Sequence, residues 1–140
     1  MIILDTNVVS EPLRQTPSPA VLTWLDGQSF ETLFLTTISL AELRFGLAAL
    51  PEGRRKRGLT QALETRLVEI FGSRILPFDT AAASAYGAIR MRAKSIGRAI
   101  GVSDGYIAAI AVAHSCSIAT RDNSPFDAAG VRVVNPWDEG

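Results

Sequence analysis

MIILDTNVVSEPL, residues 1–13, places a short apolar run directly before three polar side chains. Residues 2–4 are Ile-Ile-Leu, a composition typical of a buried strand in a parallel sheet. Asp5, Thr6 and Asn7 follow at once, and all three residue types are good N-caps for a helix. Helix capping explains a polar residue here but does not require an acid, so the rest of the chain has to decide the role of Asp5.

The composition is that of an ordinary soluble domain. The chain has 140 residues, of which 47% are hydrophobic and 20% charged, which predicts one globular domain. The single cysteine, Cys116, lies in an apolar stretch; we interpret it as a small buried side chain in a reducing, cytoplasmic protein. No apolar run approaches the roughly 18 residues of a membrane span, and the first residues lack a basic segment. We therefore expect neither a membrane anchor nor secretion.

Charge is distributed unevenly along a chain whose formal net charge is zero. Residues 52–100 hold ten Lys or Arg against four Asp or Glu, whereas the remaining residues hold four against ten. This asymmetry predicts a concentrated acidic site beside a cationic surface, a combination that suits a nucleic-acid ligand.

Strand-like and helix-like segments alternate, which predicts an α/β fold with a parallel sheet covered by helices on both faces. Ligand sites in such sheets lie beyond the carboxyl ends of the strands, where the strand order switches. Asp5 follows the first predicted strand and Asp122 follows the fourth, so we expect both to face such a site. The strands are expected at residues 2–4, 33–36, 74–77, 117–120 and 131–134, and the helices at 18–27, 39–50, 59–71, 80–96 and 103–114.

Two further acids stand at predicted helix starts. Ser39 and Glu42 in SLAELRFG match the capping box S-x-x-E, so Glu42 has a structural alternative to a functional role. Asp104 lies in GVSDGYIAAIAVAHS, at the entry to a helix that is apolar almost all round. A cap or a partner of the helix dipole is one explanation of Asp104. The other explanation is a functional site, because a helix that is apolar almost all round lies at the centre of the fold and its first turn faces the site more often than bulk solvent.

Asp122 lies in IATRDNSPFD, where Asp-Asn-Ser-Pro is also ordinary turn chemistry. Four carboxylates in one crevice would repel one another, and a divalent cation removes that penalty. Oxygen ligands without His or Cys favour Mg²⁺ or Mn²⁺ over Zn²⁺. We therefore predict a metal site formed by Asp5, Glu42, Asp104 and Asp122, supported by the side chains of Thr6, Asn7, Ser103 and Thr120.

Several motifs together resemble one known family. LDTNVVSEP, ISLAELRFG, SDGYIAAIA and IATRDNSPF occur in the order seen in PIN domains of the VapC branch of type II toxin–antitoxin toxins, and particularly in FitB-like members. RILPFD and the closing VVNPWDEG add to the resemblance, which covers essentially the whole chain.

The resemblance implies a single PIN-like domain over residues 1–140, an α/β/α sandwich around a short, mostly parallel five-stranded sheet. It also implies an endoribonuclease dependent on Mg²⁺ or Mn²⁺, whose acidic quartet falls on the four predicted acids, with the hydroxyl of Thr120 beside the fourth. Family members form homodimers and are neutralised by a cognate VapB- or FitA-like antitoxin, whose C-terminal segment enters the acidic pocket. Operator DNA is bound only through that antitoxin.

The mechanism expected from these residues is hydrolysis of an RNA phosphodiester, leaving a 5′-phosphate and a 3′-hydroxyl. Asp5 and Asp104 are the predicted direct ligands. Glu42 either binds metal or orients the water, and Asp122 supports a second ion or acts through water. Cations in two clusters of the basic section are expected to contact RNA phosphates or acids of the antitoxin, although the first cluster, residues 54–57, has a solvated loop as its alternative explanation. They are Arg54, Arg55, Lys56 and Arg57 in EGRRKRG, and Arg90, Lys94 and Arg98, expected on one helix face.

Three other functions remain open at this point. The chain could be a largely non-catalytic partner in an antitoxin–operator DNA repressor complex. It could be a structure-specific DNA nuclease, which uses the same metal chemistry. A phosphatase with Asp5 as nucleophile is disfavoured, because that pattern wants a second Asp where Asn7 stands.

Overall fold

Five short strands form one fully parallel sheet in the computed structural model, which describes residues 1–138. The strand order is β3-β2-β1-β4-β5, so the prediction of a mostly parallel five-stranded sheet is confirmed. Three of the strands are shorter than the segments predicted from composition. Their bounds are β1 Ile2–Leu4, β2 Leu33–Thr36, β3 Ile75–Leu76, β4 Ser117–Ala119 and β5 Val133–Val134.

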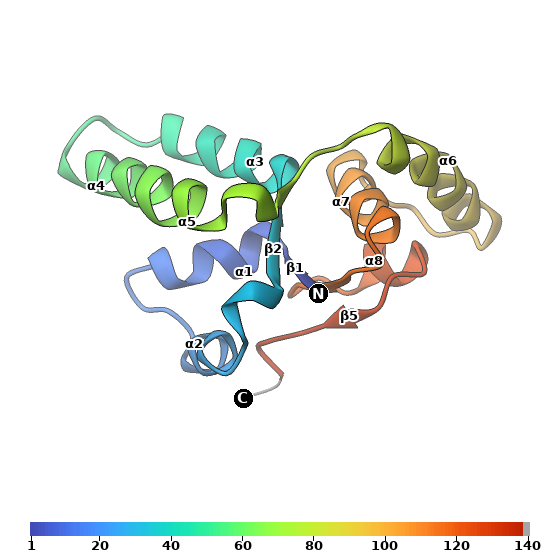
Figure 1. The fold of residues 1–140 in the computed structure, drawn as a ribbon, viewed down its shortest axis with the longest axis horizontal. Helices are drawn as coiled ribbons and strands as arrows, with labels where there is room; N and C mark the ends of the chain where they lie inside the picture. The colour runs from blue at the N-terminus through green and yellow to red at the C-terminus, as the bar shows by residue number, and fades with distance from the viewer. Residues whose placement is uncertain (139–140) are drawn as a thin grey trace.

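Helices connect the strands and cover both faces of the sheet (Figure 1). The helix α1 is missing from the predicted helical segments, although the sequence indicates Asp5 as a possible N-cap, which it is. The helix expected at 59–71 begins earlier and includes the π-helical stretch η3. The α-helices are α1 Thr6–Ser10, α2 Pro19–Asp26, α3 Thr37–Ala48, α4 Arg54–Ala62, α5 Glu69–Phe71, α6 Thr80–Ser95, α7 Val102–Ala113 and α8 Ser124–Ala128; η3 spans Leu63–Val68, and the short 3₁₀ turns are η1 Glu11–Leu13, η2 Phe30–Thr32 and η4 Gly72–Arg74.

Alternation along the strands divides the core into two layers. Ile3 and Ile118 are fully buried on one face, in a cluster with side chains of α6, α7 and α8. Leu4 and Ala119, the next residue of each strand, lie in a second cluster with side chains of α1, α2 and α5. Each central strand is therefore apolar on both sides, and the three-layer α/β/α sandwich is confirmed.

The strand order switches between β1 and β4, which places a crevice at their carboxyl ends. Leu4 pairs with Ala119 in register, and the backbone N–H of Asp5 donates to the Ala119 carbonyl at 2.9 Å. Asp5 and Thr120 are thus carried to the same edge of the sheet by the two central strands.

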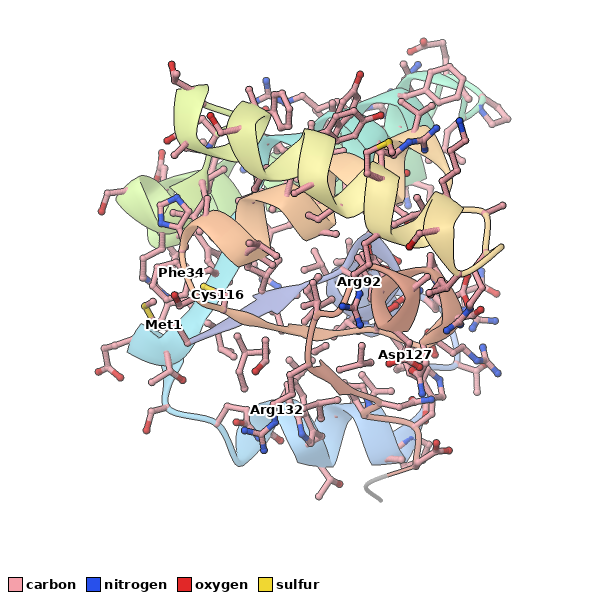
Figure 2. All side chains as sticks on the ribbon, turned by 90° about the vertical axis from the view of Figure 1, so that its right-hand side faces the viewer. Met1, Phe34, Arg92, Cys116, Asp127 and Arg132 are labelled. Carbon is pink, nitrogen blue, oxygen red and sulfur yellow. The ribbon has the colours of Figure 1, made fainter. Side chains whose placement is uncertain are left out.

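The opposite edge holds the cysteine. Cys116 is buried beside Met1 and Phe34 (Figure 2), and burial raises the pKa of its thiol. The interpretation of Cys116 as a small core side chain is consistent with this position. Among residues 1–138 no helix is both long and apolar enough to cross a membrane. The last two residues of the VVNPWDEG motif lie outside the described part of the chain.

Candidate functional site

Asp5 is the most deeply placed acid of the site, with only 6% of its surface exposed. Its Oδ2 accepts a hydrogen bond from the Thr120 hydroxyl at 2.7 Å, and its Oδ1 accepts one from the Thr6 backbone N–H at 2.8 Å. Asp5 also occupies the N-cap position of α1. Capping and the site are therefore compatible roles, and these two bonds fix the orientation of the carboxylate.

Glu42 reaches the same edge from α3. The Thr6 hydroxyl donates to its Oε1 at 2.9 Å and lies 2.9 Å from the Ser39 hydroxyl. The capping-box explanation of Glu42 is wrong, because α3 begins earlier, at Thr37, and its N-cap is Thr36. The Thr36 hydroxyl accepts from the Ser39 backbone N–H at 3.1 Å. Glu42 therefore lies beyond the first turn, held by a residue of α1 rather than by the helix end.

Asp104 lies in the first turn of α7, and the cap position belongs to Gly101. Behind it the helix is buried from Ile107 to Ala111 in the larger core cluster. The half-buried carboxylate of Asp104 is thereby held at the end of a rigid central helix that points at the crevice.

Asp122 follows β4 in the segment that leads to α8. Its backbone N–H donates to the Thr120 hydroxyl at 3.1 Å, so one side chain organises both Asp5 and Asp122. Asn7 links the segment to α1: its Oδ1 accepts from the Arg121 N–H at 3.3 Å, and its Nδ2 donates to Thr120 Oγ1 at 3.5 Å.

The four acids line one cavity of about 390 Å³. They come from four separate segments of the chain, and no Lys, Arg or His is among the residues that line the cavity. The lining residues are Asp5, Thr6, Asn7, Ser10, Glu42, Asp104 and Asp122.

Burial and the proximity of other acids raise the pKa of two of the four carboxylates. Burial raises the pKa of Asp5 above its ordinary value, and Glu42 and Asp122 add repulsion, against the opposing hydrogen bonds from Thr120 and Thr6. Burial, followed by repulsion from Asp5, Asp122 and Glu42, raises the pKa of Asp104 to about 6. A site with this much uncompensated negative charge favours a bound cation.

The donor set fits Mg²⁺ or Mn²⁺, because it consists of carboxylate, amide and hydroxyl oxygens without a thiolate or imidazole. Within residues 1–138, no three Asp, Glu, His or Cys side chains stand close enough together to hold an ion as they are placed. An ion held by one or two of the carboxylates, with water completing its coordination, would fit this arrangement.

The residues predicted to support the acids do not all reach the cavity. Thr6, Asn7 and Thr120 contact the acids or their backbone, as described above, whereas Ser103 is half-buried beside Asp104 and does not line the cavity. Sequence reasoning missed Ser10, which lines the cavity, and considered Ser39 only as a cap. Ser10 lies one helical turn after Asn7, and that spacing was its only signal.

The predicted basic track is separate from the acidic cavity, since none of its seven cations lines it. The residues 54–57 form the first turn of α4 and not a loop. Lys56 pairs with Glu52 at 2.8 Å and donates to the Ala48 carbonyl. Arg98 lies beyond the end of α6, so its expected place on one helix face with Arg90 and Lys94 is wrong.

An apolar groove of about 330 Å³ adjoins the acidic cavity and shares Thr6, Ser10 and Glu42 with it. Its lining comes mainly from α1, η1, α3 and α4. Its remaining lining residues are Leu13, Arg14, Leu43, Gly46, Leu47, Leu50, Arg55, Leu59 and Leu63.

Comparison with known proteins agrees with this architecture. Residues 2–131 match the PIN domain family, and the chain is 51% identical over 138 residues to a VapC ribonuclease, Y4jK, of Sinorhizobium fredii, covering 99% of each chain. The chain belongs to the PIN domain family, in its VapC branch. This PIN domain is also 49% identical over 139 residues to the toxin FitB of Neisseria gonorrhoeae, with 99% of this chain and 100% of that one covered. A solved structure of FitAB bound to an IR36 DNA fragment superimposes with a TM-score of 0.95 at 48% identity, covering 98% of this chain and 96% of that one.

Proposed function

We propose that this PIN domain is a metal-dependent endoribonuclease and the toxin of a type II toxin–antitoxin pair. The observation that carries the proposal is the convergence of Asp5, Glu42, Asp104 and Asp122 on one cavity without a compensating cation in its lining. The names of the similar proteins, a VapC ribonuclease and a toxin, support ribonuclease activity as the use of that cavity.

The four acids would hold Mg²⁺ or Mn²⁺, with Asp5 and Asp104 as the first choices because of their raised pKa values. When bound, such an ion supplies a water of lowered pKa and stabilises negative charge on a phosphate. The products of hydrolysis would carry a 5′-phosphate and a 3′-hydroxyl.

The hydroxyls of the chain position the carboxylates for this chemistry. Thr120 holds Asp5 through its side chain and Asp122 through its backbone, and Thr6 holds Glu42. Each bond removes rotational freedom from an acid before substrate arrives, which is how supporting hydrogen bonds tune a metal site. Burial and repulsion raise the pKa of the half-buried Asp104 carboxylate to about 6, and a bound cation would hold it in the charged form that ligates metal.

RNA phosphates would contact the exposed cations of α4 and α6. Arg54, Arg55 and Arg57 make no ion pair within residues 1–138, and Lys94 makes none there either. Binding through these side chains should weaken as salt increases. Lys56, Arg90 and Arg98 are already engaged with protein groups, so they contribute less.

The apolar groove supports docking of an antitoxin. A partner segment with apolar side chains for the leucines and a cation for the cavity would cover both surfaces at once. We propose that a cognate VapB- or FitA-like antitoxin binds in this way, that the toxin forms a homodimer in the cytoplasm, and that operator DNA is bound through the antitoxin. The likeness to FitAB bound to DNA supports this assembly.

That same likeness favours a second candidate, a largely non-catalytic partner in an antitoxin–operator DNA repressor complex. The two functions differ in whether they need the acids. Loss of the cavity's charge abolishes a nuclease, whereas a repressor subunit retains DNA-bound assembly.

Cleavage of an RNA pool by antitoxin-free protein separates the candidates. The assay compares Mg²⁺, Mn²⁺ and EDTA for the wild type, for Asp5→Asn, and for Asp26→Asn as an exposed acid outside the cavity. The nuclease requires metal-dependent cuts that Asp5→Asn loses and Asp26→Asn keeps. An RNA pool left intact by the folded wild type, with a DNA oligomer cleaved or not, would reject ribonuclease activity.

A further inference from the structure

The turn that follows α6 is built to hold one arginine in place. Gly97 has a φ of +69°, and the backbone N–H of Arg98 donates to the Ala93 carbonyl at 2.9 Å. This left-handed glycine followed by a bond reaching back five residues is a Schellman ending. The backbone of Arg98 is therefore fixed relative to α6, and its side chain starts from a defined point.

The guanidinium of Arg98 spans from this turn to the start of α8. Its Nη2 donates to the Ser124 carbonyl at 2.9 Å and lies 3.0 Å from the Ser124 hydroxyl. In Figure 2 the end of α6 lies next to α8, in agreement with this contact. Pro125 and Phe126, which follow Ser124, are buried in the core. Arg98 thus ties the first residue of α8 to the end of α6.

Asp122 lies between this contact and another fixed point. Two residues before it, Thr120 is fully buried and accepts the Asp122 backbone N–H; two residues after it, Ser124 is held by Arg98. Within residues 1–138 the exposed side chain of Asp122 makes no hydrogen bond or ion pair that would hold it over the cavity, so its position depends on these two backbone anchors.

A second arginine acts similarly on the neighbouring acid-bearing segment. Arg90 Nη1 donates to the Ile100 carbonyl at 2.5 Å, just before α7 and Asp104. Lys94 stands between the two arginines in the sequence and lines a surface recess together with them, but it donates no side-chain hydrogen bond within residues 1–138. Lys94 is therefore a matched cation that lacks the contact.

Resting on the proposed function, we propose that Arg98 is a positioning residue, which places Asp122 for metal binding by bonding to Ser124. This role differs from the phosphate contact expected from its charge. Groups that orient metal ligands typically change affinity or activity by 10- to 100-fold when removed. Because Asp122 is one of four acids, we expect the effect of Arg98 to lie near the lower limit.

Mn²⁺ titration by calorimetry tests this role in Arg98→Met and Lys94→Met, which lose the same charge. Arg98→Met should weaken Mn²⁺ binding by about 10-fold, and Lys94→Met by much less. Arg98→Lys keeps a donor and a charge on a shorter side chain, and should recover part of the affinity. Equal losses in the two Met variants would mean a general charge effect and would overturn the positioning role.

Hydrogen exchange in EDTA gives a readout that does not depend on metal or activity. The hydrogen-bonded backbone amides of Asp122 and Asp127 should exchange faster in Arg98→Met than in the wild type or Lys94→Met. Unchanged exchange together with unchanged Mn²⁺ affinity would overturn the positioning role, and a rise in KM for RNA alone would assign Arg98 to substrate binding. Absence of Mn²⁺ binding by the wild type would instead reject the proposed metal function, while the exchange result still decides whether Arg98 holds this segment.

Discussion

Replacing Asp104 by Asn should stabilise the metal-free protein at neutral pH. The pKa of Asp104 rises from 3.8 to about 6 on folding, because of burial and then repulsion from the other three acids. The charged form is therefore less favourable in the native state than in the unfolded chain. Asparagine removes that charge, and the Asp104 carboxylate accepts no side-chain hydrogen bond within residues 1–138 whose loss would offset the gain.

The magnitude follows from the size of the shift. A rise of roughly two pH units corresponds to about 3 kcal/mol, at about 1.4 kcal/mol per unit. The side chain is only half-buried, so solvent screening reduces this figure, and we expect a gain of about 1 kcal/mol in the free energy of unfolding.

The stability difference between Asp104→Asn and the wild type depends on pH. A raised native pKa contributes stability that is fully present below 3.8 and is lost as pH rises through about 6. Asp104→Asn should therefore match the wild type near pH 4 and exceed it by the full amount at pH 7.5.

Urea denaturation in EDTA at both pH values measures the difference, and saturating Mn²⁺ should reverse the order by favouring the wild type. The control is Asp26→Asn, an exposed acid outside the cavity. A variant that is less stable than the wild type at pH 7.5, or a difference that does not change with pH, would refute the raised pKa of Asp104 from which the prediction is derived.

Two further predictions concern the supports of the site. Thr6→Val removes the hydroxyl that donates to Glu42 and should lower kcat for RNA cleavage by about 10-fold without a change of fold. The control is Thr37→Val, at an exposed position at the start of α3, which should leave kcat unchanged. Equal kcat values for the two variants would show that Glu42 needs no such support. Gly97→Ala places a side chain at a φ of +69° and should reduce the free energy of unfolding by about 1 kcal/mol. Urea denaturation measures this change. An unchanged midpoint of the urea transition would mean that the turn after α6 readjusts.

The convergence of the acids could be predicted because it follows from topology. Asp5 ends a strand that is apolar on both faces, and parallel strands bring their carboxyl ends to one edge. Any acid placed after the first or fourth strand, or at the start of the helix leading into the fourth, must approach that edge. In the structure Asp5, Asp104 and Asp122 line one cavity at that edge of the sheet.

Helix ends were harder to predict, because several residues could act as the cap. Thr36, Thr37 and Ser39 are all suitable caps, and the choice of Thr36 depends on where β2 ends against β3. The same difficulty misplaced Arg98, since the periodicity of α6 continues past Gly97 although the backbone does not.

Contacts between distant segments carry no sequence signal. Thr6 with Glu42, and Arg98 with Ser124, join elements whose spacing is set only by packing. These contacts turn a set of acids into an organised site, and they appear only with the three-dimensional arrangement.

The most direct test of a metal centre at the four acids is anomalous scattering from crystals soaked in Mn²⁺. We expect Mn²⁺ density inside the cavity lined by Asp5, Glu42, Asp104 and Asp122, and its loss in crystals of Asp5→Asn. Density elsewhere on the molecule with none in the cavity, in crystals that leave the cavity open, would show that the four acids do not form a metal centre.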